Sequence, residues 1–276
     1  MKLSVVIAGS QAPPSAFVVW RGFEESVRKA ADFGYHGVEL ALQSADEIAP
    51  QKLSQWLSKA NVEVSAISTG QVFAALGLYF THPDPEIRNR VVDVFTGLIH
   101  LAKDFGQIIN VGRVRGFIAE HQTHAETESL FIDTAARLCD IAAKDGVTII
   151  IEPVNRYEIN FVNSVDEGAA IVQQVKRDNI GLMPDVFHMN IEDANIGDTL
   201  ARHKDLIKYI HFADSNRWAP GQGHLDFDEV FEALQRIRFD GWAAIEILPK
   251  PDPDTAAKQA VEYILSKMKQ YDLLSA

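Results

Sequence analysis

Short β-rich segments alternate with longer amphipathic segments along this chain, eight of each. Such alternation predicts a parallel sheet with crossover helices, and eight units close into a (β/α)8 TIM barrel. The length of 276 residues is normal for one barrel, so we predict a single domain spanning residues 1–276. The expected strands are Leu3–Ala8, Gly37–Leu42, Glu63–Thr69, Ile108–Val114, Val147–Glu152, Gly181–Asp185, Ile207–Ala213 and Trp242–Ile247. The expected helices are Phe23–Phe33, Pro50–Ala60, Pro85–Phe105, Thr127–Lys144, Val165–Val175, Ile196–His203, Phe227–Ile237 and Asp254–Tyr271.

A weak internal repeat supports the barrel. Gly34, Gly106, Gly146 and Gly241 each stand where a predicted helix gives way to a strand. Glycine adopts the left-handed conformation that ends a helix without steric cost. The alternative fold is a doubly wound open sheet, which would carry a Gly-rich phosphate loop after an early strand. No such loop follows the first predicted strand.

The net charge of the chain excludes some classes of binding partner. Lys and Arg number 26 against 38 Asp and Glu, a formal net charge of -12, so the surface should repel nucleic acid and anionic membranes. A small neutral or locally neutralised molecule is the more plausible substrate. We expect a cytoplasmic protein, because we see neither a signal peptide nor a membrane-spanning run. The single cysteine, Cys139, lies in a predicted helix and should be a core residue.

Four consecutive predicted strands end in a polar side chain. These are Glu152, Asp185, His211 and Glu246. In a parallel barrel the active site lies at the carboxyl ends of the strands, so the four should meet there. Any one of these four residues alone would be interpreted as a polar strand end that faces solvent. Three carboxylates together would repel one another, and a divalent cation removes that conflict. Three oxygen ligands and one imidazole suit Mn²⁺, Mg²⁺ or Co²⁺ better than structural zinc.

Carboxylates on opposite sides of one metal permit a defined reaction. The metal would polarise a substrate carbonyl and stabilise an enediolate. One carboxylate would remove the proton from the adjacent carbon, and another would return a proton from the opposite face. Return to the same carbon gives an epimer, and return to the neighbouring carbon gives the aldose–ketose isomer. The motif does not separate these outcomes. The polar residues that follow these strand ends suggest a polyhydroxylated ligand.

The segments Glu152–Glu158, Asp185–Asn190 and His211–Phe227 resemble the ketose 3-epimerases of the xylose-isomerase-like barrels. The resemblance extends over essentially the whole chain. It implies a metal, Mn²⁺ in the first place, held by Glu152, Asp185, His211 and Glu246. It further implies that Glu152 and Glu246 are the acid–base pair at C3 of a ketose, and that the protein is a homodimer or homotetramer. The family's substrate contacts correspond to Glu158, His188 and Arg217.

Other segments resemble one branch of that family, the 5-keto-L-gluconate epimerases. They include Thr81-His82-Pro83, Val114-Arg115-Gly116 and Asp214–Gly221. This branch implies a keto-sugar acid as substrate, converted from 5-keto-L-gluconate to D-tagaturonate. Arginine binds a carboxylate through a two-pronged contact, so we expect Arg115, or alternatively Arg113, to meet the substrate carboxylate.

Other activities remain open on the same barrel. An aldose–ketose isomerase resembling hydroxypyruvate isomerase and an inosose dehydratase would both use a related metal site. An apurinic endonuclease would need more histidine ligands and a basic surface. A sugar-binding barrel with a structural metal would bind its ligand without proton exchange, and binding alone does not require two opposed carboxylates.

Overall fold

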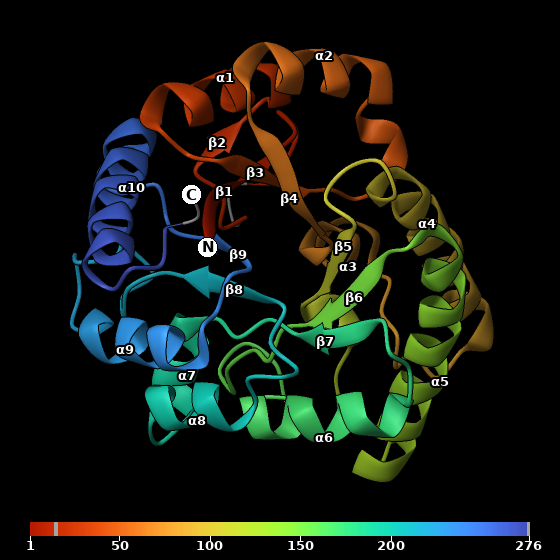
Figure 1. The fold of residues 1–276 in the computed structure, drawn as a ribbon. Helices are drawn as coiled ribbons and strands as arrows, with labels where there is room; N and C mark the ends of the chain where they lie inside the picture. The colour runs from red at the N-terminus through yellow and green to blue at the C-terminus, as the bar shows by residue number, and fades with distance from the viewer. Residues whose placement is uncertain (14–15, 275–276) are drawn as a thin grey trace.

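The computed structural model describes residues 1–13 and 16–274. Eight parallel strands form one sheet in the order β7-β6-β5-β4-β3-β1-β9-β8. Bridges between Leu182 and Ile207 and between Asp185 and His211 join its two ends. A ring of helices surrounds the strands (Figure 1). The predicted (β/α)8 barrel is therefore confirmed, and the open sheet is excluded.

The observed elements lie within a few residues of the predicted ones. The barrel strands are β1 (Lys2–Ala8), β3 (Gly37–Ala41), β4 (Glu63–Ser68), β5 (Ile108–Val111), β6 (Thr148–Ile151), β7 (Ile180–Leu182), β8 (Tyr209–Phe212) and β9 (Trp242–Ile245). The outer helices are α1 (Phe23–Phe33), α2 (Pro50–Ala60), α4 (Pro85–Ala102), α5 (His124–Ala142), α6 (Val165–Val175), α8 (Ile196–Arg202), α9 (Phe227–Ile237) and α10 (Pro253–Gln270).

Several short elements were not predicted. They are the two-residue strand β2 (Trp20–Arg21), the helices α3 (Gly70–Leu76) and α7 (Val186–Glu192), and the 3₁₀ turns η1 (Ala45–Glu47), η2 (Arg113–Arg115) and η3 (Ala143–Asp145). Strand β5 ends at Val111, three residues before its predicted end, because the chain turns into η2 there. This early turn decides where two arginines lie.

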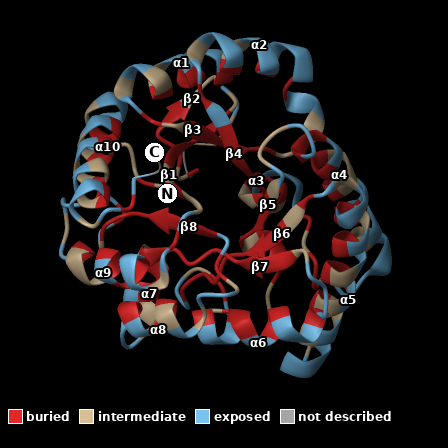
Figure 2. Ribbon diagram, in the orientation of Figure 1, coloured by how far each residue is buried: buried red, intermediate tan, exposed pale blue. Residues whose placement is uncertain are grey.

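Two apolar layers hold the barrel together. The larger fills the space between the strands and the outer helices, whose outward faces are exposed (Figure 2). The smaller lies inside the barrel and includes Val6, Ala66, Ile150, Met183 and Tyr209. Side chains alternate between the two faces of a strand, so Tyr209 and His211 of β8 both face the interior. The barrel interior is thus filled by apolar side chains, and polar side chains gather at the carboxyl ends of the strands.

The glycine repeat has two physical causes. Gly34 and Gly106 have φ angles of 90° and 84°, the left-handed conformation expected at a helix end. Gly241 does not have it; Arg238, with φ 55°, ends α9 instead. A Cβ atom at Gly241 would approach the Lys208 carbonyl oxygen to 3.1 Å. Our explanation for Gly241 was therefore wrong, and close packing accounts for it.

Two smaller expectations concern Cys139 and membrane spans. Cys139 is fully buried in the core, and burial raises the pKa of its thiol to about 12. Within residues 1–13 and 16–274, no helix is long and apolar enough to cross a bilayer.

Candidate functional site

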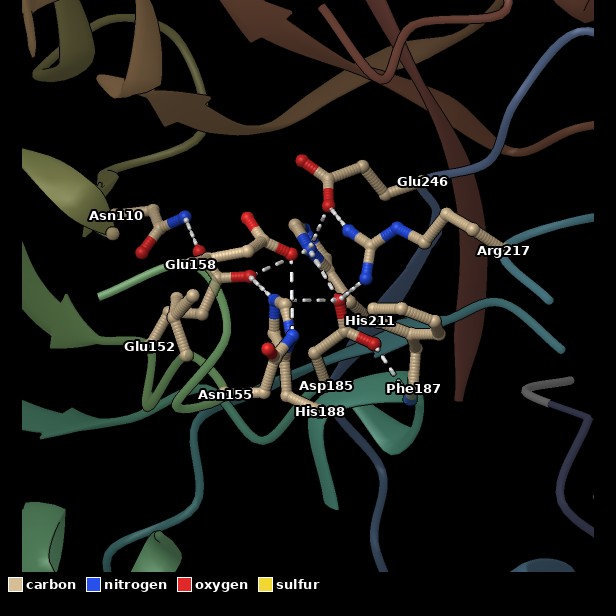
Figure 3. Close-up of polar contacts among 12 residues, drawn as sticks. Asn110, Glu152, Asn155, Glu158, Asp185, Phe187, His188, His211, Arg217 and Glu246 are labelled. Atoms are coloured by element: carbon tan, nitrogen blue, oxygen red, sulfur yellow. Dashed lines mark hydrogen bonds and ion pairs between the residues drawn. The ribbon is translucent and has the colours of Figure 1, made fainter. Parts of the chain in front are cut away.

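The four strand-end side chains converge at the carboxyl end of the barrel. Glu152 follows β6, Asp185 follows β7, His211 lies in β8 and Glu246 follows β9. One potential ligand atom from each lies within 4.8 Å of the others. Glu152 and Glu246 approach from different sides, with Asp185 and His211 between them (Figure 3). Strands β7 and β8 separate β6 from β9 around the barrel, which accounts for that separation.

The geometry around His211 fits a metal ion. Its Nδ1 lies 3.6 Å from Glu152 Oε1, 3.5 Å from Glu246 Oε2 and 4.0 Å from Asp185 Oδ2. Ligands bound at about 2.0–2.2 Å to one ion lie roughly 3–4 Å apart. Within the described residues, this buried Nδ1 has no hydrogen-bond partner. A buried nitrogen facing three carboxylates without a hydrogen bond is suited to ligate a divalent cation.

The electrostatics favour a cation as well. Burial raises the pKa of Asp185 to about 7, even though Arg217 and His211 oppose that rise. Burial acts to lower the pKa of His211, but Glu39 and Glu246 outweigh it and hold the pKa well above its usual value. Burial therefore favours the protonated form of Asp185, and the negative charge around His211 favours its protonated form. A bound divalent cation would supply that positive charge in place of protons.

Arg217 neutralises part of the same charge. Its Nη1 donates to Asp185 Oδ2 at 2.7 Å, and its Nη2 donates to Glu246. Burial acts to raise the pKa of Glu246, but Arg217 and His211 outweigh it and lower the pKa to about 2. The guanidinium lies between the rings of Phe17 and Phe187, 4.9 and 4.6 Å from their centres. Stacking and paired charges hold Arg217 at the edge of the pocket.

Glu158 and His188 line the same pocket as Arg217. Asn155 positions both: its Nδ2 lies 2.7 Å from His188 Nδ1 and 3.2 Å from Glu158 Oε1. Since an amide nitrogen can only donate, His188 Nδ1 accepts and its Nε2 carries the hydrogen. That Nε2 lies 3.9 Å from Glu152 Oε1 and 3.8 Å from Asp185 Oδ2. His188 thus presents a donor to a ligand beside the carboxylates.

Two neighbours on one side, Asn110 and Gly112, define the position of the Glu152 carboxylate. Asn110 of β5 donates from Nδ2 to Glu152 Oε2 at 3.1 Å. On the same side, a Cβ atom at Gly112 would lie 2.7 Å from Glu152 Oε2, so only glycine allows the carboxylate to lie there. One oxygen is thereby fixed while the other, Oε1, faces His211 and His188.

The structure corrects the expected role of Arg115. Its side chain is fully buried, and it donates to the backbone oxygens of Gly112, Glu152, Phe161 and Val162 at 2.7–3.1 Å. A 3₁₀ turn has three residues per turn, so positions two apart do not share a face. Consequently Arg113 lines the pocket, while Arg115 lies beneath the loop that follows β6. Arg115 anchors this loop instead of meeting substrate.

We expect Arg115→Met to destabilise the fold by about 3–5 kcal/mol. Each buried carbonyl that loses a partner costs about 1–3 kcal/mol, and relaxation recovers part of the sum. Chemical denaturation would measure the change. The exposed Arg137, which donates to Asn89 Oδ1, provides a matched control, since Arg137→Met should change stability by about 0.5 kcal/mol or less. Equal effects of the two substitutions would contradict the anchoring role.

Arg113 is the arginine of this turn that reaches the pocket. Within the described residues, its guanidinium makes no hydrogen bond and no ion pair, in contrast to Arg115 and Arg217. Burial raises the pKa of Glu158, while the charges of Arg217 and then Arg113 act to lower it. Arg113 therefore has donors to offer to an acidic group on a ligand.

Several site residues escaped the sequence analysis. Asn110 and Glu39 lie within strands rather than at their ends, so the search for polar strand ends passed over them. Both show one signal: a polar side chain in an apolar strand, as in Gly37-Val38-Glu39-Leu40-Ala41. Phe17 and Phe187 carried no signal, because aromatic residues are common in any core.

Comparison with known proteins gives concordant results. The family described as "Xylose isomerase-like TIM barrel" matches residues 27–267. A ketose 3-epimerase of Arthrobacter globiformis is 29% identical over 230 residues, covering 82% of this chain and 77% of the relative. An L-ribulose 3-epimerase of Methylomonas sp. (strain DH-1) is 30% identical over 226 residues, covering 80% of this chain and 76% of the relative.

A solved structure has the same fold. The D-allulose 3-epimerase from Methylomonas sp., crystallised in complex with D-allulose, matches with a TM-score of 0.80. The two chains are 24% identical, and the match covers 97% of each.

Proposed function

The chain belongs to the xylose isomerase-like TIM barrel family, and from that premise we propose that it is a metal-dependent epimerase inverting C3 of a ketose or keto-sugar acid. The two relatives described above are named epimerases, so the chain is an isomerase acting on a sugar. The observation that carries the proposed chemistry is the pair Glu152 and Glu246, which face one small space from different sides.

In this proposal the site residues have three roles: metal binding, proton transfer and substrate binding. Glu152, Asp185, His211 and Glu246 would hold a divalent metal, Mn²⁺ in the first place and Co²⁺ or Mg²⁺ as alternatives. When bound, that metal supplies a Lewis acid that polarises the substrate carbonyl. Glu152 and Glu246 move the proton at C3, one removing it and the other returning it from the opposite face. Glu158, His188 and Arg217 hydrogen-bond substrate oxygens at the pocket wall.

The substrate class follows from Arg113. A guanidinium at the pocket wall that has no partner among the described residues suits a carboxylate, so the proposed substrate is a keto-sugar acid of the 5-keto-L-gluconate type, with D-tagaturonate as product. We further propose a cytoplasmic homodimer or homotetramer whose partner is this small molecule rather than nucleic acid or membrane.

Proton exchange tests the function. The metal-reconstituted enzyme is incubated in D2O with a panel of ketoses and keto-sugar acids, and NMR identifies the products. Epimerisation gives an inverted C3 carrying deuterium. An aldose–ketose isomerase would move the carbonyl, a dehydratase would lose water, and a binding protein would exchange nothing. Any of these three results contradicts the proposed reaction.

Arg113→Met should lower kcat/KM on the keto-sugar acid by about 10–100-fold. A hydrogen bond to a charged group contributes about 1.5–3 kcal/mol, and each 1.4 kcal/mol is tenfold. The uncharged ketose analogue should lose little, which steady-state kinetics on the two substrates would reveal. Arg113→Lys keeps the charge without the planar fork, so its kcat/KM on the keto-sugar acid should lie between the values of the wild type and Arg113→Met. Equal efficiency on both substrates, unchanged by Arg113→Met, would remove Arg113 from substrate recognition.

A further inference from the structure

Beneath the four converging side chains, a fourth carboxylate contacts His211. Glu39 Oε2 lies 2.9 Å from His211 Nε2, on the side of the ring opposite the atom that faces Glu152, Asp185 and Glu246. Glu39 belongs to β3, and β1 and β9 separate β3 from β8 in the sheet. The contact therefore crosses the barrel interior, and both side chains are fully buried.

A carboxylate in this place is costly. Glu39 lies in an apolar strand, and its second oxygen, Oε1, is buried without a hydrogen-bond partner among the described residues. Burying a charge with incomplete hydrogen bonding destabilises a fold, and a well-packed apolar residue of similar size is often neutral or better. Stability thus gives no reason for a glutamate here.

The hydrogen bond to Glu39 fixes the tautomer of His211. Ionised glutamate only accepts, so Nε2 must carry the hydrogen. The lone pair of a neutral imidazole then lies on Nδ1, the nitrogen that faces the three carboxylates. A negative charge behind the ring also increases the electron density available at Nδ1.

We propose that Glu39 is a positioning residue for the metal site, holding His211 in the tautomer and orientation in which Nδ1 ligates the ion. This inference rests on the metal site of the proposed function. In the contacts described, Glu39 touches none of the three carboxylates that would ligate the ion. Its effect is exerted through the imidazole.

Neighbouring polar groups provide a matched control. Ser4 is equally buried in the barrel interior, and its hydroxyl contacts Tyr209 Oη and the Ala243 carbonyl at 3.0 and 3.1 Å. No described hydrogen bond joins Ser4 to His211. Ser4→Ala therefore disturbs the same polar interior without touching the ligand.

The test measures metal affinity and the ligand field in Glu39→Gln, Glu39→Met and Ser4→Ala. Apo proteins are titrated with Mn²⁺ against a chelating indicator, and the visible spectrum of the Co²⁺ form is recorded. Loss of such a contact typically weakens metal binding by 10–100-fold, so we expect about 10-fold for Glu39→Gln and about 100-fold for Glu39→Met. Glutamine keeps an acceptor oxygen, which explains the smaller effect and safeguards folding. Ser4→Ala should bind as the wild type does.

The outcomes separate the two proposals. Wild-type affinity and an unchanged Co²⁺ spectrum in both Glu39 variants would overturn the role of Glu39 and leave the metal site standing. A wild-type protein that binds neither Mn²⁺ nor Co²⁺ would overturn the metal site and this inference together. Equal weakening by Ser4→Ala would also overturn the inference, since general disturbance of the interior would then explain the loss.

Discussion

Glu152→Gln and Glu246→Gln should each lower turnover by about 10²–10⁴-fold, the usual cost of losing a positioned acid–base group. Glutamine preserves the size of the side chain and an oxygen atom but cannot exchange a proton with carbon. The two losses should differ in kind, because the carboxylates come from different sides of the pocket. Each variant should still wash solvent deuterium into one epimer and not into the other, which NMR in D2O distinguishes.

The exposed Glu232 on α9 supplies the control for these substitutions. Glu232→Gln removes the same charge far from the chemistry and should retain full turnover. Near-wild-type turnover in both active-site variants would show that the two-carboxylate mechanism is wrong. A wild-type product without deuterium at the inverted carbon would require a shielded proton or a hydride route instead.

Removal of metal should abolish turnover altogether, and Mn²⁺ or Co²⁺ should restore it. The ion would also stabilise the fold, because it offsets the cost of burying the Asp185 carboxylate, which raises the pKa of that group. At a metal concentration 100 times Kd, the gain is about 2.7 kcal/mol, so the melting temperature should rise with added metal. Activity assays after chelation and thermal melts at several metal concentrations would measure both effects.

Asp185→Asn is the companion variant for this prediction. It removes one charged ligand, so added Mn²⁺ should raise its melting temperature less than that of the wild type. Full activity after exhaustive chelation, with no metal found by elemental analysis, would contradict metal dependence.

Much of the fold could be predicted because its signals are local. Alternating strand and helix patterns, each confined to one short stretch of the chain, specified the order of the barrel, and α1, α2, α6 and α9 have the predicted ends. The four converging side chains could be predicted from the sequence as well. All strands of a parallel barrel end at one face, so position within a strand substitutes for position in space.

Side-chain direction beyond a strand end was decided by the tertiary structure. In a strand that ran on through these positions Arg113 and Arg115 would share a face, whereas the 3₁₀ turn that follows Val111 points them in different directions. Each arginine follows the strand within a few residues, and nothing in the local sequence separates a donor to substrate from a donor to buried carbonyls. Only the loop that packs over Arg115, with Phe161 and Val162, makes that distinction.

The sequence by itself determined the barrel and the four side chains that meet at its mouth, since these depend on periodicity and strand order. The tertiary structure alone decided which residues support them. Glu39 lies 172 residues from His211 in the chain, and Asn110 lies 42 residues from Glu152. The first contact arises from closure of the barrel, which brings β3 and β8 together across its interior, and the second arises from the pairing of the neighbouring strands β5 and β6. No repeat or motif encodes that pairing, because it depends on the stagger and packing of the whole sheet.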